Sequence, residues 1–501
     1  MNERKLGILI SYINILFQTV INFIYVPILL YYIGKSEYGL YQLIGSFIAY
    51  FSIMDFGLTA AVVRFYTKYK ALNDRINMEN VLAISTRCYA VITLILFIIG
   101  YICYLIIDDI FYSSMTYSEI DSAKKIFILL LLNIVVTIST MIFRAIINAH
   151  EKFLFLKGIE TIQLVLQPIL VVAILQEYPY AFSVALVQTI LNIFLSIARG
   201  FYCFKRLKIR IKYHYWDKKL FKEFKKLALS VFAVTLIDQV FFKTNQIILG
   251  IISGTSAVAV YAIASLIYMN YMALSLAISG VYLPHVTEMV AKKEAMKLIS
   301  NLFINIGRWQ YFLLAAISSG FFIFGKTFIV FWAGKGFEDA YWITLLIIIP
   351  FTIDLIQNIG LSILQAENKY DFRAKVYFCM GVFNLCLAIP LAKMYGGIGC
   401  AFATGLSMFI GNGLIMNWYY LNITKLDIIL FWKNISKITI GVIIVTIIGY
   451  IFNGMIEDKN IIVFIMKLLI YTILYIGVMY KFFMNIDEKS KIKSLVLKFK
   501  R

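Results

Sequence analysis

Long stretches of mostly apolar residues follow one another along the whole chain, and only short polar segments separate them. About twenty consecutive apolar residues in a helix are enough to cross a bilayer. We therefore predict about fourteen transmembrane helices, near residues 6–32, 40–63, 81–107, 125–148, 158–175, 181–204, 227–251, 257–282, 302–325, 341–366, 376–392, 398–421, 436–453 and 461–483. Because the connections are short, the function is expected to lie inside the helical bundle.

Composition supports a membrane protein. Apolar residues make up 61% of the 501, and the mean hydropathy is +0.84. Soluble domains contain about 45–50% apolar residues, so a soluble fold of this chain would expose large apolar patches. The first apolar run is too long for the core of a cleavable signal peptide, and we interpret it as the first span.

The net charge of +20 is distributed unevenly between the two sides of the predicted bundle. With the N-terminus inside, 34 of the 47 Lys and Arg residues fall in cytoplasmic segments. This is the positive-inside pattern, so we expect both termini in the cytoplasm and an even number of crossings. The basic charge is therefore attributed to membrane lipids, and no nucleic-acid partner is predicted.

The densest basic segment, 205–226, lies near the midpoint and is expected to lie along the anionic inner leaflet. Short matches support a repeat on either side of it: 149–155 resembles 366–372, and Gly34, Ser36 and Tyr41 correspond to Gly254, Ser256 and Tyr261. Each repeat would hold six spans and keep the same orientation. We predict an N-terminal lobe (1–204), a linker (205–226), a C-terminal lobe (227–421), and two further helices with a basic tail (422–501).

Polar residues at helical spacing mark one face of seven predicted spans. Each stripe alone is compatible with hydrogen bonds between helices, but stripes in both halves fit a hydrated central cavity better. From the stripes we select the candidate substrate-binding amides Asn14, Gln18, Gln163, Gln246 and Asn358.

Charged residues inside spans are costly and therefore informative. Lys243 lies near the middle of the seventh span, too deep to reach the interface easily. Arg64, Arg144 and Arg308 lie closer to the cytoplasmic side, where the alternative is that they extend to the interface. Arg and Lys bind phosphate strongly, so these four cations are candidates for an anionic substrate. The deep acids Asp55, Asp238 and Asp354 are candidates for coupling to an ion.

Metal and disulfide chemistry are not predicted. The six cysteines lie within or beside apolar stretches, and no Cys or His has the spacing of a metal site. We therefore predict no cofactor.

Several local sequences resemble the polysaccharide transporter branch of the multidrug/oligosaccharidyl-lipid/polysaccharide exporter superfamily, the Wzx-type O-antigen flippases. The resemblance covers essentially the whole chain and rests on the order and spacing of non-catalytic motifs. These are Tyr38-Gly39-Leu40-Tyr41-Gln42, the run from Asp55 to Phe65, the run from Ile363 to Lys369, and the turn from Gly396 to Ala401.

The resemblance implies an all-α membrane protein in which two six-helix lobes face each other in a V around a central cavity, with two added helices. It implies that undecaprenyl-diphosphate-linked oligosaccharide moves from the inner to the outer leaflet of the bacterial cytoplasmic membrane by alternating access, for O-antigen or capsule synthesis. A proton or sodium gradient is the expected driving force, and the polymerase and glycosyltransferases of the pathway are the expected partners of a monomer.

Two other function classes compete with this interpretation. A cation-coupled small-molecule exporter of the same superfamily is expected to have an acid-rich cavity, whereas this interior has at least as many bases as acids. A polytopic polymerase or glycosyltransferase would need a larger outer loop with catalytic side chains. The longest predicted outer loops have about 15–17 residues, and all three histidines map to the cytoplasmic side, so we predict a transporter and not an enzyme.

Overall fold

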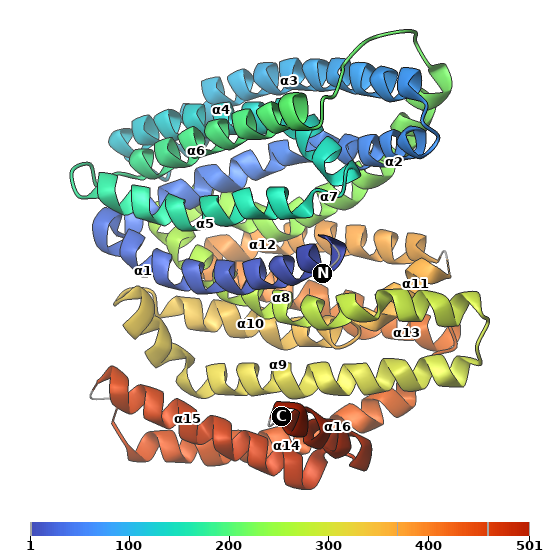
Figure 1. Ribbon diagram of the computed structural model, residues 1–501. Coiled ribbons are helices and arrows are strands. Elements are labelled where there is room, and N and C mark those ends of the chain that lie inside the picture. The colour runs from blue at the N-terminus through green and yellow to red at the C-terminus, as the bar shows by residue number, and fades with distance from the viewer. Residues whose placement is uncertain (1–2, 368, 458–459, 500–501) are drawn as a thin grey trace. The chain divides into compact units, whose positions relative to one another are not determined.

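The computed structural model describes residues 3–367, 369–457 and 460–499, and these residues form helices and connections without a β-strand (Figure 1). The all-α prediction is confirmed. The α-helices of the first half are α1 (Glu3–Phe51), α2 (Leu58–Ala71), α3 (Arg75–Phe111), α4 (Tyr117–Ala149), α5 (Phe153–Leu175), α6 (Ala181–Phe201) and α7 (Lys218–Ser253).

The second half continues with helices of 7 to 39 residues. They are α8 (Thr255–Ala291), α9 (Met296–Ala333), α10 (Asp339–Leu355), α11 (Asn358–Ala366), α12 (Tyr370–Met408), α13 (Met416–Asn422), α14 (Ile428–Met455), α15 (Ile461–Val478) and α16 (Ile486–Phe499). Ten of the described helical stretches are long and apolar enough to cross a membrane, and the bent pair α10 and α11 could form one more span. The chain is thus a multi-pass membrane protein; fourteen as the exact number of crossings stays a prediction.

Two continuous helices, α1 and α12, each contain one predicted span and the beginning of the next. The backbone leaves helical geometry at Gly34 in α1 (φ 74°) and at Gly396 in α12 (φ 56°). Positive φ is a conformation that glycine adopts without strain from a β-carbon. These two positions coincide with the polar breaks between predicted spans, so the sequence pattern located both turns correctly.

Contacts divide the chain into two compact units, Met1–Ala262 and Ile263–Arg501. The boundary falls within α8, and the basic linker belongs to the first unit. The domain limits predicted from sequence differ from this boundary and stay a prediction. Gly254, between α7 and α8, has a φ of 79°, close to the 74° of Gly34; the repeat itself stays a prediction.

A carboxylate joins three helices of the first unit. Glu119, in the first turn of α4, accepts hydrogen bonds from Ser36 (2.6 Å) on α1 and Thr255 (2.9 Å) on α8. It also closes a capping box with Thr116, which satisfies free N–H groups at the start of α4. The turn at Gly34 is therefore fixed against neighbouring helices.

In the second unit α9 packs against α14 and α15, which lie beside it in Figure 1. A β-carbon at Gly449 of α14 would come within 2.6 Å of the Tyr471 ring. Only glycine permits this close approach of α14 to α15. The aromatic residues of α9 and α15 then face each other and form the site described next.

Candidate functional site

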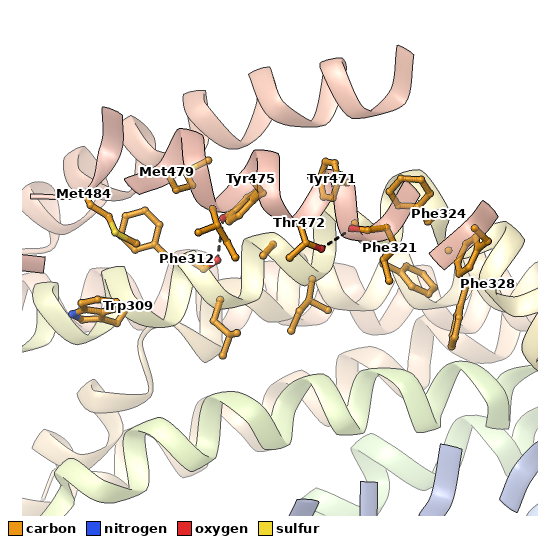
Figure 2. Close-up of a pocket in the computed structure, with 18 of the residues that line it drawn as sticks. Trp309, Phe312, Phe321, Phe324, Phe328, Tyr471, Thr472, Tyr475, Met479 and Met484 are labelled. Carbon is orange, nitrogen blue, oxygen red and sulfur yellow. Dashed lines mark hydrogen bonds between the residues drawn. The ribbon is translucent and has the colours of Figure 1, made fainter. Parts of the chain in front are cut away.

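An apolar groove runs along α9 and α15 in the second unit (Figure 2). Its volume is about 750 Å³. It extends along α9 from Trp309 to Phe328, which is about 28 Å of helix at ~1.5 Å per residue. The hydrocarbon core of a bilayer is ~30 Å thick, so the groove is nearly as long as the membrane core is deep.

The side chains that line the groove are almost all apolar. Polar side-chain atoms come from Trp309, Tyr471, Thr472 and Tyr475 alone among the nineteen lining residues. The Tyr475 hydroxyl donates to the Phe312 carbonyl at 3.0 Å (Figure 2), and the Tyr471 hydroxyl donates to Ser319 at 2.7 Å. With these hydroxyls bonded to the protein, the groove suits a hydrocarbon chain far better than a sugar or a charged group.

A buried ion pair lies beside one end of this groove, close to Trp309 and Met484. Arg308 is 2% exposed and donates two hydrogen bonds to Glu488 of α16, at 2.7 and 2.9 Å. The same guanidinium donates to the Phe483 carbonyl at 3.1 Å. Arg308 was selected from sequence as a ligand for an anionic substrate. Its donors are already bound to protein groups here, a geometry that favours a structural role, and the binding role stays a prediction.

Two other candidates of the second unit also have protein partners. Asp354, at the end of α10, accepts a hydrogen bond from Arg373 at 3.1 Å, and both side chains are largely buried. Asn358, at the start of α11, donates to Ser275 at 3.2 Å. Both residues flank the bend between α10 and α11, where free backbone groups need partners. Their proposed roles in ion coupling and sugar binding remain untested.

Lys243 differs from these groups. It is partly buried on α7, and in the described part of the chain no hydrogen bond or ion pair reaches its ammonium group. Directly after it, α7 is bonded to α1, through Thr244 to Tyr50 and through Gln246 to Ser46. A cation within an apolar helix and without a counter-charge is costly, so Lys243 keeps its place as the leading candidate for binding an anion.

A second group of cations lies between α4, α5 and α6. Glu160 accepts from Arg144 at 3.0 Å and from Lys157 at 2.8 Å. Arg199 lies close enough for both Arg144 and Glu160 to act on it electrostatically, and its Nε is buried without a partner among the described residues. Arg144 and Lys157 thus share one carboxylate, with Arg199 close by. Arg144 fits an anion site here, but it is already engaged by Glu160.

The other predicted residues of the first unit occupy varied surroundings. Asp55 accepts from Thr59 (2.8 Å) and Tyr89 (2.9 Å) where the chain turns between α1 and α2. Gln18 and Arg64 are exposed, Gln163 and Asp238 are partly buried, and Asp238 has electrostatic or hydrogen-bonding neighbours. The side chain of Asn14 lies outside the described residues. Arg64 lies in the middle of α2 with an exposed side chain, and the alternative in which it reaches the membrane interface stays a prediction.

The candidates thus fall into two sets. Lys243, Gln246, Arg144 and Asp55 belong to the first unit, and Arg308, Asp354 and Asn358 belong to the second. Sequence reasoning missed Glu488 and Arg373, which were counted only as parts of basic cytoplasmic segments. Neither residue carries a local signal, because each partner lies on a different helix. In the described part of the chain, no three His, Cys, Asp or Glu residues come together as a metal site would require.

Comparison with known proteins agrees with these features. A family model described as "Polysaccharide biosynthesis protein" matches residues 6–290. A Shigella flexneri protein named "Putative O-antigen transporter" is 23% identical over 398 residues, which cover 77% of this chain and 90% of that protein.

Solved structures share the fold at low sequence identity. The lipid II flippase MurJ in an inward closed conformation has a TM-score of 0.74 at 17% identity, over 95% of this chain and 99% of that one. An inward-facing multidrug resistance transporter of the MATE family has a TM-score of 0.64 at 12% identity, over 82% and 95%. The fold is therefore that of the MATE and MurJ transporters.

Proposed function

The chain belongs to the polysaccharide biosynthesis protein family, and from that premise we propose that it is a flippase for lipid-linked oligosaccharide. The proposed substrate is an undecaprenyl-diphosphate-linked repeat unit, carried from the inner to the outer leaflet of the bacterial cytoplasmic membrane. Alternating access would expose the headgroup first to one side and then to the other. The product would serve synthesis of a surface polysaccharide such as O-antigen or capsule.

The observation that carries this proposal is the apolar groove of the second unit. A polyprenyl tail is a long hydrocarbon that must stay in an apolar environment while its headgroup crosses the membrane. The groove offers such an environment over nearly the full depth of the hydrocarbon core. An exporter of small water-soluble molecules has no need of an apolar track of this length, so the groove favours a lipid-linked substrate.

The cations of the first unit are assigned to the diphosphate. Lys243 has an ammonium without a protein partner among the described residues, and it can form charge-assisted hydrogen bonds with phosphate oxygens. The group of Arg144, Lys157 and Arg199 brings three cationic side chains together and is assigned as a second contact for phosphate. Gln246, Gln163, Gln18, Asn14 and Asn358 are assigned to sugar hydroxyls, and Arg308 is left out because Glu488 already binds it.

A proton or sodium gradient is the proposed driving force. Asp55 is the strongest candidate for the coupling acid because the described part of the chain gives it hydroxyl partners and no bound cation. Asp354 is weaker because Arg373 already neutralises it. The protein is proposed to act as a monomer with both termini in the cytoplasm, and to pass its product to a polymerase after the glycosyltransferases have built it.

The test is to fill the groove and follow the lipid-linked intermediate. Gly320 lies in the groove, and a β-carbon there would meet Tyr471 only at an ordinary contact distance of 3.6 Å. Gly320→Leu should therefore fold normally and block the tail. Gly477→Leu on α15 is the matched control, because Gly477 is exposed and has open space around it.

In cells that lack the native protein, Gly477→Leu should restore the surface polysaccharide. Cells with Gly320→Leu should instead accumulate lipid-linked oligosaccharide in the inner leaflet. Leaflet-resolved labelling of the glycan measures this accumulation. Full restoration by Gly320→Leu at normal abundance would remove the groove from the mechanism. If deletion caused no inner-leaflet accumulation, the flippase proposal itself would fail.

A further inference from the structure

The basic linker between α6 and α7 has a defined conformation, which the proposed transport function does not use. Residues 207–217 form neither helix nor strand and connect the π-helical turn Tyr202–Arg206 to Lys218 at the start of α7. Figure 1 shows this segment as the long loop that leads to α7, beyond the end of α3 near α2. An amphipathic helix, the usual form of an interfacial segment, is therefore absent from this stretch.

Hydrogen bonds to the start of α3 hold the segment in place. The side-chain oxygen of Asn80, a buried residue, accepts from the backbone N–H groups of His214 (3.2 Å) and Tyr215 (3.3 Å). Glu79 lies 3.0 Å from the His214 ring nitrogen. A buried amide that satisfies two consecutive backbone donors fixes the course of the chain, because leaving those groups unpaired would be unfavourable.

Exposure alternates along residues 208–212 of this segment. Lys208, Arg210 and Lys212 are exposed, whereas Ile209 is buried and Ile211 is half-buried. The Ile209 amide also donates to the Cys203 carbonyl at 3.3 Å. The isoleucines attach the segment to the protein, and the three cations form a row on its outer side.

Aromatic side chains continue this outer surface. Tyr213, Tyr215 and Trp216 are exposed. Trp and Tyr are the residues that prefer the boundary between hydrocarbon and headgroups in a membrane. Arg87 stacks on the Tyr213 ring at 3.7 Å from its centroid, so the cationic surface extends onto α3. Among the described residues, four acids lie near this surface. Glu79 lies against His214 and Arg75, Asp74 caps α3 through the Asn77 amide, Asp217 caps α7 through the Leu220 amide, and Glu223 follows on α7.

We infer that residues 205–216 form a built docking surface for the anionic phospholipid headgroups of the cytoplasmic leaflet. The row of Lys208, Arg210 and Lys212 would contact lipid phosphates, and Tyr215 and Trp216 would insert at the headgroup boundary. Charge complementarity identifies anionic phospholipid as the ligand. An anionic bilayer surface attracts each nearby cation, and this attraction falls off within a Debye length. Exposed aromatic residues beside the cations favour a lipid surface over a soluble polyanion.

The test is backbone hydrogen exchange in the full-length protein reconstituted into nanodiscs. Exchange of residues 207–213 is compared in phosphatidylcholine alone and in phosphatidylcholine mixed with phosphatidylglycerol, with the amides of α4 as the internal reference. We expect exchange of this segment to slow about tenfold in the anionic nanodiscs, an effect of the size expected for a few surface cations. Salt at about 1 M, where the Debye length is ~3 Å, should remove the difference.

Two linker variants make the result specific. The neutral variant K208Q/R210Q/K212Q should lose the dependence on anionic lipid, and the charge-conserving variant K208R/R210K/K212R should keep it. A melting temperature in detergent equal to that of the native protein would show that each variant keeps its fold. The inference is overturned if anionic lipid has no effect, if the neutral variant keeps the effect, or if a short oligonucleotide added to phosphatidylcholine nanodiscs slows exchange where phosphatidylglycerol does not.

Discussion

Arg308 and Glu488 are separated by 180 positions in the chain, yet the guanidinium and the carboxylate meet in a buried pair at 2.7 and 2.9 Å. Glu488 also accepts from the Asn485 backbone N–H at 2.7 Å, at the start of α16. The Glu488 carboxylate therefore caps the start of α16 and binds this helix to α9 through Arg308. The pair lies beside the end of the groove, where Phe312 packs under the Arg308 guanidinium at 5.6 Å.

Removal of one partner should destabilise the protein strongly. Glu488→Ala leaves the Arg308 charge buried without its counter-ion, which typically costs about 3–5 kcal/mol. We expect a clear fall in the melting temperature of the purified protein in detergent. Arg308→Lys should also lower the melting temperature, because lysine cannot form the same bidentate hydrogen bonds with a carboxylate.

A double replacement separates the structural role of this pair from substrate binding. In Arg308→Met/Glu488→Leu both charges are absent, and such replacements are often neutral or stabilising. We expect the double variant to regain much of the melting temperature and to restore surface polysaccharide in a deletion strain. A double variant that is stable but inactive would instead return Arg308 to the list of substrate ligands.

Lys243 should show the opposite relationship between stability and activity. Among the described residues its ammonium has no partner, so Lys243→Met removes a desolvated charge and should leave the melting temperature unchanged or raise it. The same change should abolish restoration of surface polysaccharide, because the diphosphate loses its cation. Lys243→Arg keeps the charge and should retain part of the activity; a fully active Lys243→Met would refute the assignment.

Lys467 provides a contrasting lysine on α15. It is 2% exposed and donates to the Asn453 side chain at 3.0 Å and to the Asn453 carbonyl at 3.3 Å. It also donates to the Ile456 carbonyl just beyond α14. The ammonium therefore satisfies carbonyl groups at the C-terminal end of α14, which would otherwise lack partners.

Lys467→Met should lower the free energy of unfolding by about 1–3 kcal/mol, the usual cost of unsatisfied buried acceptors. Surface polysaccharide should still form at permissive temperature, since Lys467 is given no part in substrate binding. The measurement is the melting temperature of Lys467→Met beside that of Lys243→Met. Equal behaviour of the two variants would contradict the distinction drawn here between a capping lysine and a ligand-binding lysine.

The contrast between these lysines shows how far the sequence could be interpreted. Hydropathy is a local property, so it predicted the helical segments and the turns at Gly34 and Gly396. It also showed that Lys243 lies deep in a span. For Lys467, hydropathy gives only the distance to the predicted end of its own helix. The carbonyl groups that Lys467 binds come from the preceding helix, and no spacing within its own span could reveal them.

Pairing between distant helices was likewise beyond the sequence. Arg308, Asp354 and Asn358 were selected because polar groups in a span need partners. That reasoning was sound, but it could not decide whether the partner is substrate or protein. Glu488 lies in a basic tail and Arg373 in a basic loop, where surrounding lysines suggested a solvated or lipid-facing segment. Only the packing of α9 with α16 and of α10 with α12 brings these groups together.

His150 gives the protein a predictable dependence on pH. It lies in the connection between α4 and α5, and its Nε2 is 3.0 Å from the Tyr66 hydroxyl. Burial, followed by the positive charges of Lys70 and Lys152, lowers the pKa of His150 to about 4. At neutral pH the imidazole is therefore neutral, and its Nε2 can accept a hydrogen bond from the Tyr66 hydroxyl.

The sign of the effect follows from the two protonation states. In the unfolded chain a histidine has a pKa of about 6.5, so below that pH the unfolded state binds a proton that the folded state does not. The contribution to stability is complete above about pH 6.5 and is lost as the pH falls toward 4. Between about pH 7.5 and about pH 5, the melting temperature of the native protein should fall more than that of His150→Gln, which can still bond to Tyr66 and does not titrate. Equal falls in the two proteins would show that His150 does not contribute to acid sensitivity, and a larger fall in His150→Gln would mean that protonation of His150 stabilises the fold.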